Sequence, residues 1–203
     1  MSTLKTTNIT HNSNSGTANI VLDSSGNIEI PDKIIHSGDT NTAIRFSAAD
    51  TVSIETAGSS RFSINADGIV TKPVQPAFRA EKTGGGYNHS AGTFPFSNEI
   101  FDKNNDYDPS TYTFTAPVDG VYLFDCSLMA AGSASARGMN FRKNGSNVSV
   151  TQWYKPGGSG DYYNNAAMCI LDLSASDTVL VYVSADADMH GGNYIHFSGY
   201  LLG

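Results

Sequence analysis

The chain has 203 residues, with 12 Lys and Arg against 19 Asp and Glu, so its formal net charge is -7 at pH 7. An acidic chain repels phosphate backbones, which argues against nucleic acid as a partner. Charged residues make up only 15% of the chain, and the abundance of Ser, Thr, Asn and Gly favours strands joined by short turns over helices.

The N-terminal residues are polar and lack the apolar region of a signal peptide. No stretch approaches the roughly 20 apolar residues of a membrane span, so membrane insertion is not expected. The two cysteines, Cys126 and Cys169, lie far apart in sequence and in no metal-ligand spacing. Both fall inside apparent strands, which favours two buried thiols over a disulfide.

Residues 16–73 contain only short apolar runs, each separated from the next by a turn signal. The runs are 20–22, 28–30, 34–35, 43–46, 52–54 and 62–64. Residues 20–28 and 62–69 weakly repeat the pattern of short strand, Gly turn and short strand. Such strands are too short, and their large side chains too few, to bury a core within one copy. We therefore predict a β-repeat stem that is completed when several chains wind together.

Residues 77–203 are richer in aromatic side chains and show clear period-two alternation. The predicted single-face sets are Tyr112, Phe114 and Ala116; Tyr122, Phe124, Cys126 and Leu128; Ala167, Cys169, Leu171 and Leu173; and Val179, Val181 and Val183. Asn144-Gly145 between alternating runs is a strong hairpin signal. This half predicts a β-sandwich of about eight to ten strands.

The stretch FTAPVDGVYLF, residues 114–124, predicts a tight corner. Pro117 ends one strand because it cannot donate to a ladder, Asp119-Gly120 turns the chain, and 121–128 begins the next strand.

The aromatic spacing around this corner resembles the C1q-like domain of the C1q and tumour-necrosis-factor superfamily. It runs through Phe96, Asp102, Tyr107, Phe114, Gly120, Tyr122 and Phe124, and Phe197 to Leu202 resembles the last strand of the family. Cys126 departs from the pattern, which has Phe or Tyr there. The resemblance covers about 77–203 and implies an all-β, ten-strand jelly-roll head that assembles as a tight trimer.

The first half resembles segments of bacteriophage tail-fibre and appendage proteins, especially those of marine cyanophages. The segments that carry this resemblance are MSTLKTTNI and DKIIHSGDTNTAIRFSAADTVSIET. Together the halves resemble a virion structural protein on the exterior of a phage particle: 1–15 attaches to other virion proteins, 16–73 is a trimeric stem, and the head binds a host receptor, glycan or protein. The alternative is a trimeric capsid decoration or stabilising protein with no receptor role.

Consecutive antiparallel strands place their connections at alternate ends. Residues 131–136, 155–161 and 186–193 should therefore share the end opposite the stem, where three copies would present them around one axis. The predicted binding residues are Ser133, Ser135, Lys155, Asp161, Tyr162, Asp186, Asp188, His190 and Asn193. Trp153, Tyr154, Tyr162 and Tyr163 are alternatively sugar-stacking or packed in the core or trimer seam, and packing is favoured for most of the four.

Asp186 and Asp188, with His190 and Asn193 nearby, carry oxygen and nitrogen atoms in close spacing, and C1q-like heads sometimes carry calcium near the tip. The closing Glu of a calcium loop is missing, which favours a solvated polar loop. No nucleophile, base or carboxylate pair stands out, so the sequence predicts neither an enzyme nor a bound cofactor.

Overall fold

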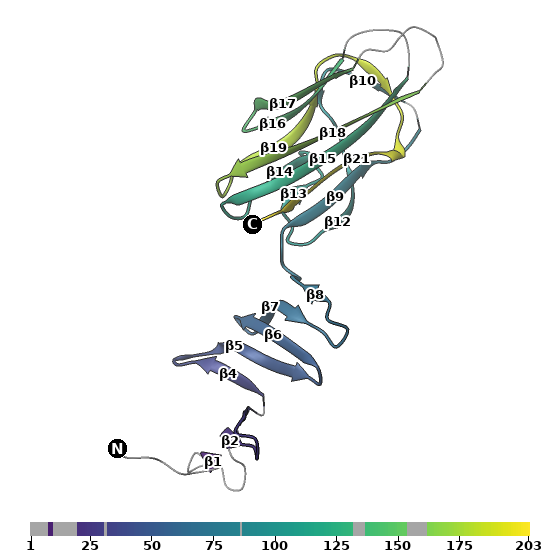
Figure 1. Cartoon of the computed structure of the whole chain (residues 1–203). Helices are drawn as coiled ribbons and strands as arrows, with labels where there is room; N and C mark the ends of the chain where they lie inside the picture. Colours follow the sequence, from purple (N-terminus) through teal and green to yellow (C-terminus); the bar gives the residue numbers. More distant parts are fainter. Residues whose placement is uncertain (1–7, 10–19, 31, 86, 132–136, 154–161) are drawn as a thin grey trace. The chain divides into compact units, whose positions relative to one another are not determined.

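The computed structural model describes residues 8–9, 20–30, 32–85, 87–131, 137–153 and 162–203. These residues form strands and turns without any helix, as the composition predicted. Across these ranges the search for a helix long and apolar enough to cross a bilayer finds none. The chain divides into two compact units, Met1–Pro73 and Val74–Gly203 (Figure 1).

The first unit begins with a small antiparallel sheet. Its strands are β1 (Asn8–Ile9), β2 (Ile20–Leu22) and β3 (Ile28–Glu29), in that order. The carboxylate of Asp23 shapes the turn from β2 to β3, because it accepts hydrogen bonds from the backbone N–H groups of Ser25 and Asn27, each at 2.8 Å. Gly26 closes the turn at a φ of 86°, which glycine adopts without steric cost.

The rest of this unit is a five-stranded antiparallel sheet in which each strand pairs with the next. Its strands are β4 (Lys33–His36), β5 (Asp39–Ala48), β6 (Thr51–Thr56), β7 (Ser59–Ile64) and β8 (Val70–Thr71). The sequence predicted turns at Gly38, Gly58 and Gly68, and all three have positive φ. The predicted short strands are therefore present, extended by polar residues that continue the ladders.

One face of this sheet is apolar across all five strands. Cross-strand pairing aligns Ile34, Ile44, Ile54 and Phe62 in one row and Val52, Ile64 and Val70 in a second, and we call these seven residues the apolar β4–β8 face. Ile34, Ile44 and Ile54 are each nearly half exposed. Among the described residues of the unit only Ala43 and Ser53 are buried, and both lie on the other face. One copy of this sheet therefore has no interior of its own.

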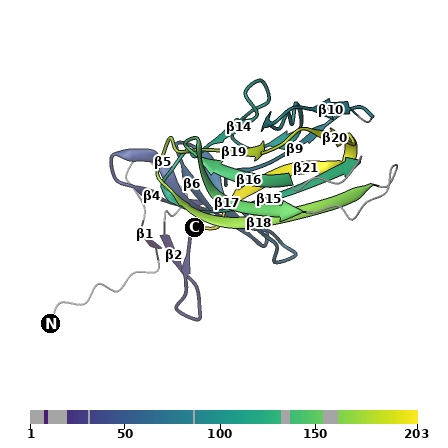
Figure 2. The ribbon, with the colours of Figure 1, turned by 90° about the horizontal axis from the view of Figure 1, so that it is seen from above.

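The second unit is a sandwich of two antiparallel sheets. The first sheet contains seven strands: β9 (Ala77–Lys82), β10 (Tyr87–His89), β12 (Asn98–Asp102), β15 (Gly120–Ala131), β18 (Tyr163–Leu173), β20 (Ala187–Met189) and β21 (Gly192–Leu201). The second contains six: β11 (Gly92–Thr93), β13 (Tyr107–Asp108), β14 (Thr113–Thr115), β16 (Arg137–Lys143), β17 (Ser146–Trp153) and β19 (Thr178–Val183). Figure 2 shows β15, β18 and β21 side by side, in agreement with their pairing.

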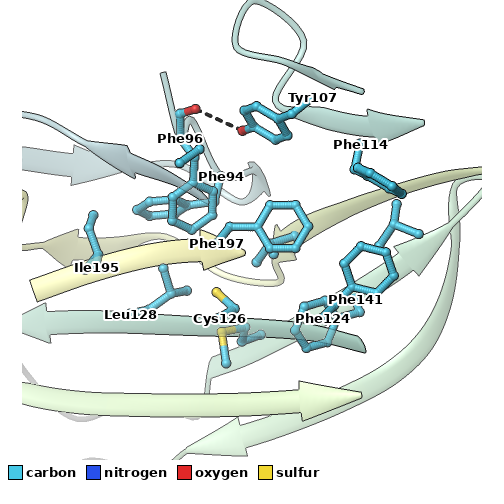
Figure 3. Packing of buried hydrophobic residues seen from close by; sticks show 14 of the residues in the cluster. Phe94, Phe96, Tyr107, Phe114, Phe124, Cys126, Leu128, Phe141, Ile195 and Phe197 are labelled. Atoms are coloured by element: carbon cyan, nitrogen blue, oxygen red, sulfur yellow. Dashed lines mark hydrogen bonds between the residues drawn. The ribbon is translucent and has the colours of Figure 1, made fainter. Parts of the chain in front are cut away.

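The core lies between the two sheets and follows the alternation of the sequence. Three predicted sets point inward: the set on β15 is fully buried, the valines of β19 are fully buried, and the set on β18 is half buried except for buried Leu173. Phe197 of β21 lies among the aromatic rings, 4.9 Å from Phe78 and 6.0 Å from Phe124 between ring centroids (Figure 3). Aromatic packing therefore joins β9, β15 and β21.

The phenol of Tyr107 is a buried polar group whose hydrogen bond is made with the backbone. The hydroxyl of Tyr107, which is 2% exposed, donates to the carbonyl oxygen of Phe96 at 2.9 Å, drawn as the dashed line in Figure 3. Burial raises the pKa of this phenol far above its ordinary value. The group therefore stays a neutral donor at any pH at which the fold persists.

Both cysteines are free thiols, as predicted. Cys126 is fully buried and Cys169 is half buried. Burial raises the pKa of both thiols, that of Cys169 to about 11. Both are protonated at neutral pH and act as packing groups, because the thiolate is the reactive form.

Two details of the predicted strands are wrong. Tyr112 was placed on a strand with Phe114, but it has a φ of 60° and belongs to the turn that precedes β14. The carboxylate of Asp108 holds this turn, since it accepts hydrogen bonds from Ser110 and Thr111. The thirteen described strands of the unit also exceed the ten predicted, because five of them have only two or three residues.

The corner from β14 to β15 forms where the sequence predicted it. β14 ends before Pro117, and β15 begins at Gly120. The hydroxyl of Tyr122 turns back and donates to the carbonyl oxygen of Val118 at 2.8 Å. A β-carbon at Gly120 would lie 2.7 Å from the side chain of Leu201 and 3.1 Å from the backbone oxygen of Gly203, so a larger residue here would displace the Leu201 side chain.

A second turn is tied to the same end of the sandwich by a carboxylate. Asp177 accepts hydrogen bonds from the Lys143 ammonium at 2.7 Å, the Asn144 amide at 2.7 Å and the backbone N–H of Ser174 at 2.8 Å. Asn144 and Gly145 both have positive φ, as the predicted two-residue hairpin requires. These bonds, the one from Lys143 foremost, lower the pKa of Asp177 to about 2.

We expect Tyr107→Phe to lower the free energy of unfolding by about 1 to 3 kcal/mol, because the Phe96 carbonyl loses its donor inside the core. Urea denaturation followed by circular dichroism measures this loss. The matched control is Tyr112→Phe at the turn, for which a change below about 0.5 kcal/mol is expected. Equal losses in the two variants would contradict the role given to the buried hydroxyl.

We expect Asp177→Asn to lower the melting temperature at pH 7 and to remove part of the acid sensitivity of the fold. A carboxyl whose folded pKa is lowered to about 2 stabilises the fold above its unfolded pKa, and this contribution is lost as pH falls from about 4 through 2. Melting curves at pH 7, 4 and 3 should show the difference between variant and wild type shrinking at pH 3. Asp172→Asn, at an exposed carboxylate, serves as control, and a constant difference at every pH would rule the effect out.

Candidate functional site

Strand registers sort the loops of the second unit between two opposite ends. On β15, Gly120 pairs with Leu173 at one end and Ala130 pairs with Tyr163 at the other. The chain enters the unit at the first end, because Ala77 of β9 lies opposite Tyr200 near the C-terminus. We call this first end the base end and the opposite end the far end.

The described strand ends follow the alternation expected from the sequence. The Asn144-Gly145 turn and residues 174–177 lie at the base end, where Asn144 and Asp177 are bonded. The strands on either side of the predicted segments 131–136, 155–161 and 186–193 end at the far end, where Arg137 pairs with Trp153 and Met139 with Val183. The three segments predicted to share one end are therefore flanked by strands that end together.

Five of the nine predicted binding residues lie within the described part of the chain: Tyr162, Asp186, Asp188, His190 and Asn193. Ser133, Ser135, Lys155 and Asp161 lie outside the described residues, as does Tyr154.

The segment 186–193 is not the continuous loop that the sequence predicted. Asp188 lies in β20 and Asn193 lies in β21. β20 forms because it pairs with both β10 and the end of β15, and Met189 anchors it with its side chain buried in the core. Only the short connection between these strands remains irregular.

Three aromatic rings gather at the far end. His190 lies between Tyr162 and Tyr194, with ring centroids 4.9 Å from each and interplanar angles of 80°. Tyr162 is 56% and Tyr194 51% exposed, whereas His190 is partly buried. We call these residues the far-end aromatic cluster. Exposed rings with hydroxyl groups offer apolar stacking surface and hydrogen bonds at low entropic cost, as in antibody paratopes.

The imidazole of His190 is fixed by the backbone around it. The backbone N–H of His190 donates to the carbonyl oxygen of Met129 at 2.9 Å. The ring atom Nδ1 lies 2.9 Å from the carbonyl oxygen of Gly191, so in the neutral ring Nδ1 carries the proton and Nε2 is an acceptor. The cluster therefore presents two flat faces, two hydroxyl groups and one ring acceptor in a defined arrangement.

The carboxylates proposed for calcium lie on neighbouring elements of this end. Asp186 accepts a hydrogen bond from the backbone N–H of Ala91 at 2.8 Å, and Asp188 lies in β20 opposite Asn88 and Ala131. Within the described ranges, no group of three or more His, Cys, Asp or Glu side chains is placed to hold a metal ion. Calcium binding was the less favoured alternative to a solvated polar loop in the sequence analysis, and calorimetric titration with calcium tests it.

Sequence reasoning missed two parts of the far end. Tyr194 completes the aromatic cluster, and β10 brings the segment after Gly84 beside β20. A β-carbon at Gly191 would overlap the carbonyl group of Gly84, so these two segments meet backbone to backbone. The glycine pairs Gly84-Gly85 and Gly191-Gly192 are the signal of this approach, but one sequence does not show which glycines meet.

A second surface lies on the seven-stranded sheet, on the face turned away from the core. Its apolar members are Phe101, Leu123, Met168, Ile170 and Tyr200, and we call this surface the outer sheet face. Met168 and Ile170 are more than 60% exposed. A hollow of about 320 Å³ between Phe101, Leu123 and Tyr200 is lined also by Arg79 and Asp125. This is a large apolar surface for a single soluble copy.

The structure brings together a Ser, a His and an Asp that sequence reasoning had kept apart. Ser127 pairs with His196 across β15 and β21, and Nε2 of His196 lies 3.0 Å from Oδ2 of Asp125. The Ser127 hydroxyl, however, is 2.6 Å from Oδ1 of Asn164 and donates there. In a serine nucleophile the hydroxyl bonds the imidazole, so this arrangement does not match that geometry.

The arrangement of the second unit matches a known family. Residues 77–202 match the model of the C1q domain, which spans more than half of the chain. The chain belongs to the C1q domain family. The resemblance seen in the aromatic spacing is thereby confirmed, and Cys126 occupies a fully buried core position despite its departure from the pattern.

Solved structures support the same fold. The chain is similar to the globular domain of the zebrafish complement 1qA protein, with a TM-score of 0.51 and 18% identity over 64% of this chain and 98% of that one. It is also similar to the Eiger TNF of S. frugiperda, with a TM-score of 0.53 and 11% identity over 64% of this chain and 94% of that one. At these identities the likeness concerns the fold, a jelly roll of the C1q and TNF type.

Proposed function

We propose that the protein is a homotrimeric virion appendage of the tail-fibre type, whose C1q domain attaches to a host surface receptor. The observation that carries the proposal is the apolar β4–β8 face, which one copy leaves uncovered. A structural protein that works only as an assembly accounts for such a face, because exposed apolar area of this extent drives association.

Copies of the same chain are the occupants best suited to this face. Its members are β-branched or aromatic and lie in straight cross-strand rows, so equivalent sheets can pack face to face. Three sheets arranged around an axis would give each face two neighbours and enclose the side chains in a shared core. The β4–β8 sheet is then the wall of a trimeric stem.

The C1q domain also favours an assembly of three copies. Domains of this fold commonly form trimers, and the outer sheet face offers the surface for it. Met168 and Ile170 on β18, with Tyr200 on β21, stand out from this face, and the neighbouring hollow can receive a side chain of another copy. Both units therefore favour one oligomeric state, which makes the trimer the simplest common solution.

The attachment role rests on the resemblance of the first half to phage appendage proteins and on the character of the far end. Residues 1–15 would dock on other virion proteins, placing the protein on the particle exterior. The far-end aromatic cluster combines exposed rings with hydroxyl groups, which suits a glycan or a protein epitope. A trimer would present three such clusters, so weak single contacts would add by avidity.

We expect the purified protein to have a mass of about 64 kDa in solution, three times that of the 21.5 kDa chain. Ile34→Asp on the apolar β4–β8 face should raise the dissociation constant of the trimer at least about 100-fold, or about 3 kcal/mol, because three carboxylates would be buried together. Size-exclusion chromatography with light scattering measures both quantities.

The matched control is Ile35→Asp. Ile35 lies next to Ile34 on β4, is equally exposed in one copy, and points to the other face of the sheet. The control should remain trimeric. A monomeric wild type, or equal behaviour of the two variants, would refute the proposed stem.

We expect the double variant Tyr162→Ala, Tyr194→Ala to lose at least about tenfold in binding to host cells while keeping the trimer mass, because hot-spot aromatic residues carry much of an interface's energy. Fluorescently labelled protein is incubated with a panel of marine cyanobacteria, and cell-bound fluorescence is measured by flow cytometry. Cryo-electron microscopy of the particle separates a tail appendage from a capsid decoration.

Val118→Ala is the control for this experiment, because Val118 is exposed at the base end and the substitution keeps the backbone carbonyl that accepts from Tyr122. It should bind cells like the wild type. If the tyrosine variant also binds like the wild type, the far end is not the attachment surface.

A further inference from the structure

A group of charged side chains crosses the middle of the outer sheet face. Nε2 of His196 on β21 lies 3.0 Å from the carboxylate of Asp125 on β15. On the other side, His196 is directly opposite Glu81 on β9, which places their β-carbons about 5 Å apart. Glu81 in turn binds the guanidinium of Arg79 at 3.0 and 3.1 Å. The four groups lie in one row across three neighbouring strands.

This charged row lies inside an otherwise apolar surface. Asp125 and Arg79 line the hollow together with Phe101, Leu123 and Tyr200. The side chains of His196 and Glu81 are already only 19% and 15% exposed in one copy. Contact with a second copy on this face would therefore remove most of the water that remains around the row. The net charge of a set of side chains matters most once they are desolvated.

The residues paired with the row on the two flanking strands, β18 and β12, are uncharged. Opposite Ser127 on β18 is Ala166, and opposite Asp125 is Met168. Opposite Glu81 on β12 is Asn98. The charged groups that face His196 are therefore Asp125 from one side and Glu81, with its partner Arg79, from the other.

The net charge of the row depends on the His196 proton. Two carboxylates and one guanidinium sum to -1 when the imidazole is neutral, and protonation brings the sum to zero. In a trimer, protonation of all three His196 side chains changes the summed charge of the three rows from -3 to zero. Burying a balanced set of hydrogen-bonded ions costs less than burying an excess of one sign.

We propose that His196 makes assembly of the C1q domain proton-dependent, with the imidazolium form strengthening the contact between copies through the outer sheet face. The inference rests on the proposed trimer and assigns its regulation to one side chain. Histidine is the side-chain type that ordinarily changes charge between pH 5 and 8, whereas carboxylates and guanidinium groups ordinarily titrate outside that range. The trimer is then expected to dissociate less readily at mildly acidic pH than at alkaline pH.

Subunit exchange tests this inference without requiring the trimer to fall apart on dilution. Two populations of the full-length protein carry donor and acceptor fluorophores, and energy transfer after mixing reports the exchange rate at pH 6 and pH 8.5. We expect wild-type exchange to be at least about tenfold faster at pH 8.5. Each proton whose binding is linked to assembly can change the stability of the trimer by up to tenfold per pH unit.

Two variants give opposite results if the charge balance is the cause. His196→Gln keeps an N–H donor for Asp125 but cannot titrate, so its exchange rate should be the same at both pH values. Asp125→Asn leaves Glu81 and Arg79 balanced, so protonation of His196 then adds an uncompensated charge, and exchange should be faster at pH 6. His190→Gln, at the far end, should behave like the wild type.

Light scattering on the same samples separates this inference from the proposal on which it depends. A trimer whose exchange rate does not differ between the two pH values, including one with no measurable exchange, overturns the role of His196 and leaves the trimer standing. The same holds if His196→Gln keeps the wild-type response. A monomer at both pH values overturns the proposed function and the inference together.

Discussion

Each sheet of this protein has two faces, and an apolar face must be covered by a second layer. In the C1q domain the two sheets cover each other, and the alternation on β15 and β19 puts every second side chain into a shared core. Among the described residues of the first unit, no second layer covers the apolar face of the β4–β8 sheet, although its apolar rows are as regular as those of a sandwich. The chain therefore carries more apolar face than one copy can cover, and this imbalance is the physical reason to expect an assembly.

The C1q domain has its hydrogen-bonded corner and its exposed aromatic cluster at opposite ends. The base end is closed by the Tyr122 hydroxyl on Val118, by the Asp177 carboxylate on three donors, and by the close passage of Leu201 over Gly120. The far end carries exposed aromatic side chains. A tied base leaves the far-end segments able to vary while the core persists, which is how loops on a rigid scaffold acquire binding roles.

The sequence predicted correctly those features whose signal lies within a few neighbouring residues. The inward set on β15, the Asn144-Gly145 hairpin and the corner before Gly120 follow from alternation and turn chemistry within about ten residues. Tyr112 was misplaced because the Asp108 carboxylate accepts three hydrogen bonds from Ser110 and Thr111, and these turn the chain against the alternation. β20 was missed because a three-residue strand gains its stability from partners on β10 and β15, which lie tens of residues away.

The candidate sites depend on register even more strongly than the fold does. Tyr162 and Tyr194 meet at His190, and Asp125 meets His196, only because particular residues face each other across β15, β18 and β21. A shift of one residue in any of these pairings would send half of these side chains into the core. The buried sets on the same strands exclude such a shift, since Phe124, Cys126 and Phe197 fill the interior in this register alone. The aromatic core therefore fixes the pattern on the outer sheet face, from the apolar hollow through the charged row to the far-end aromatic cluster.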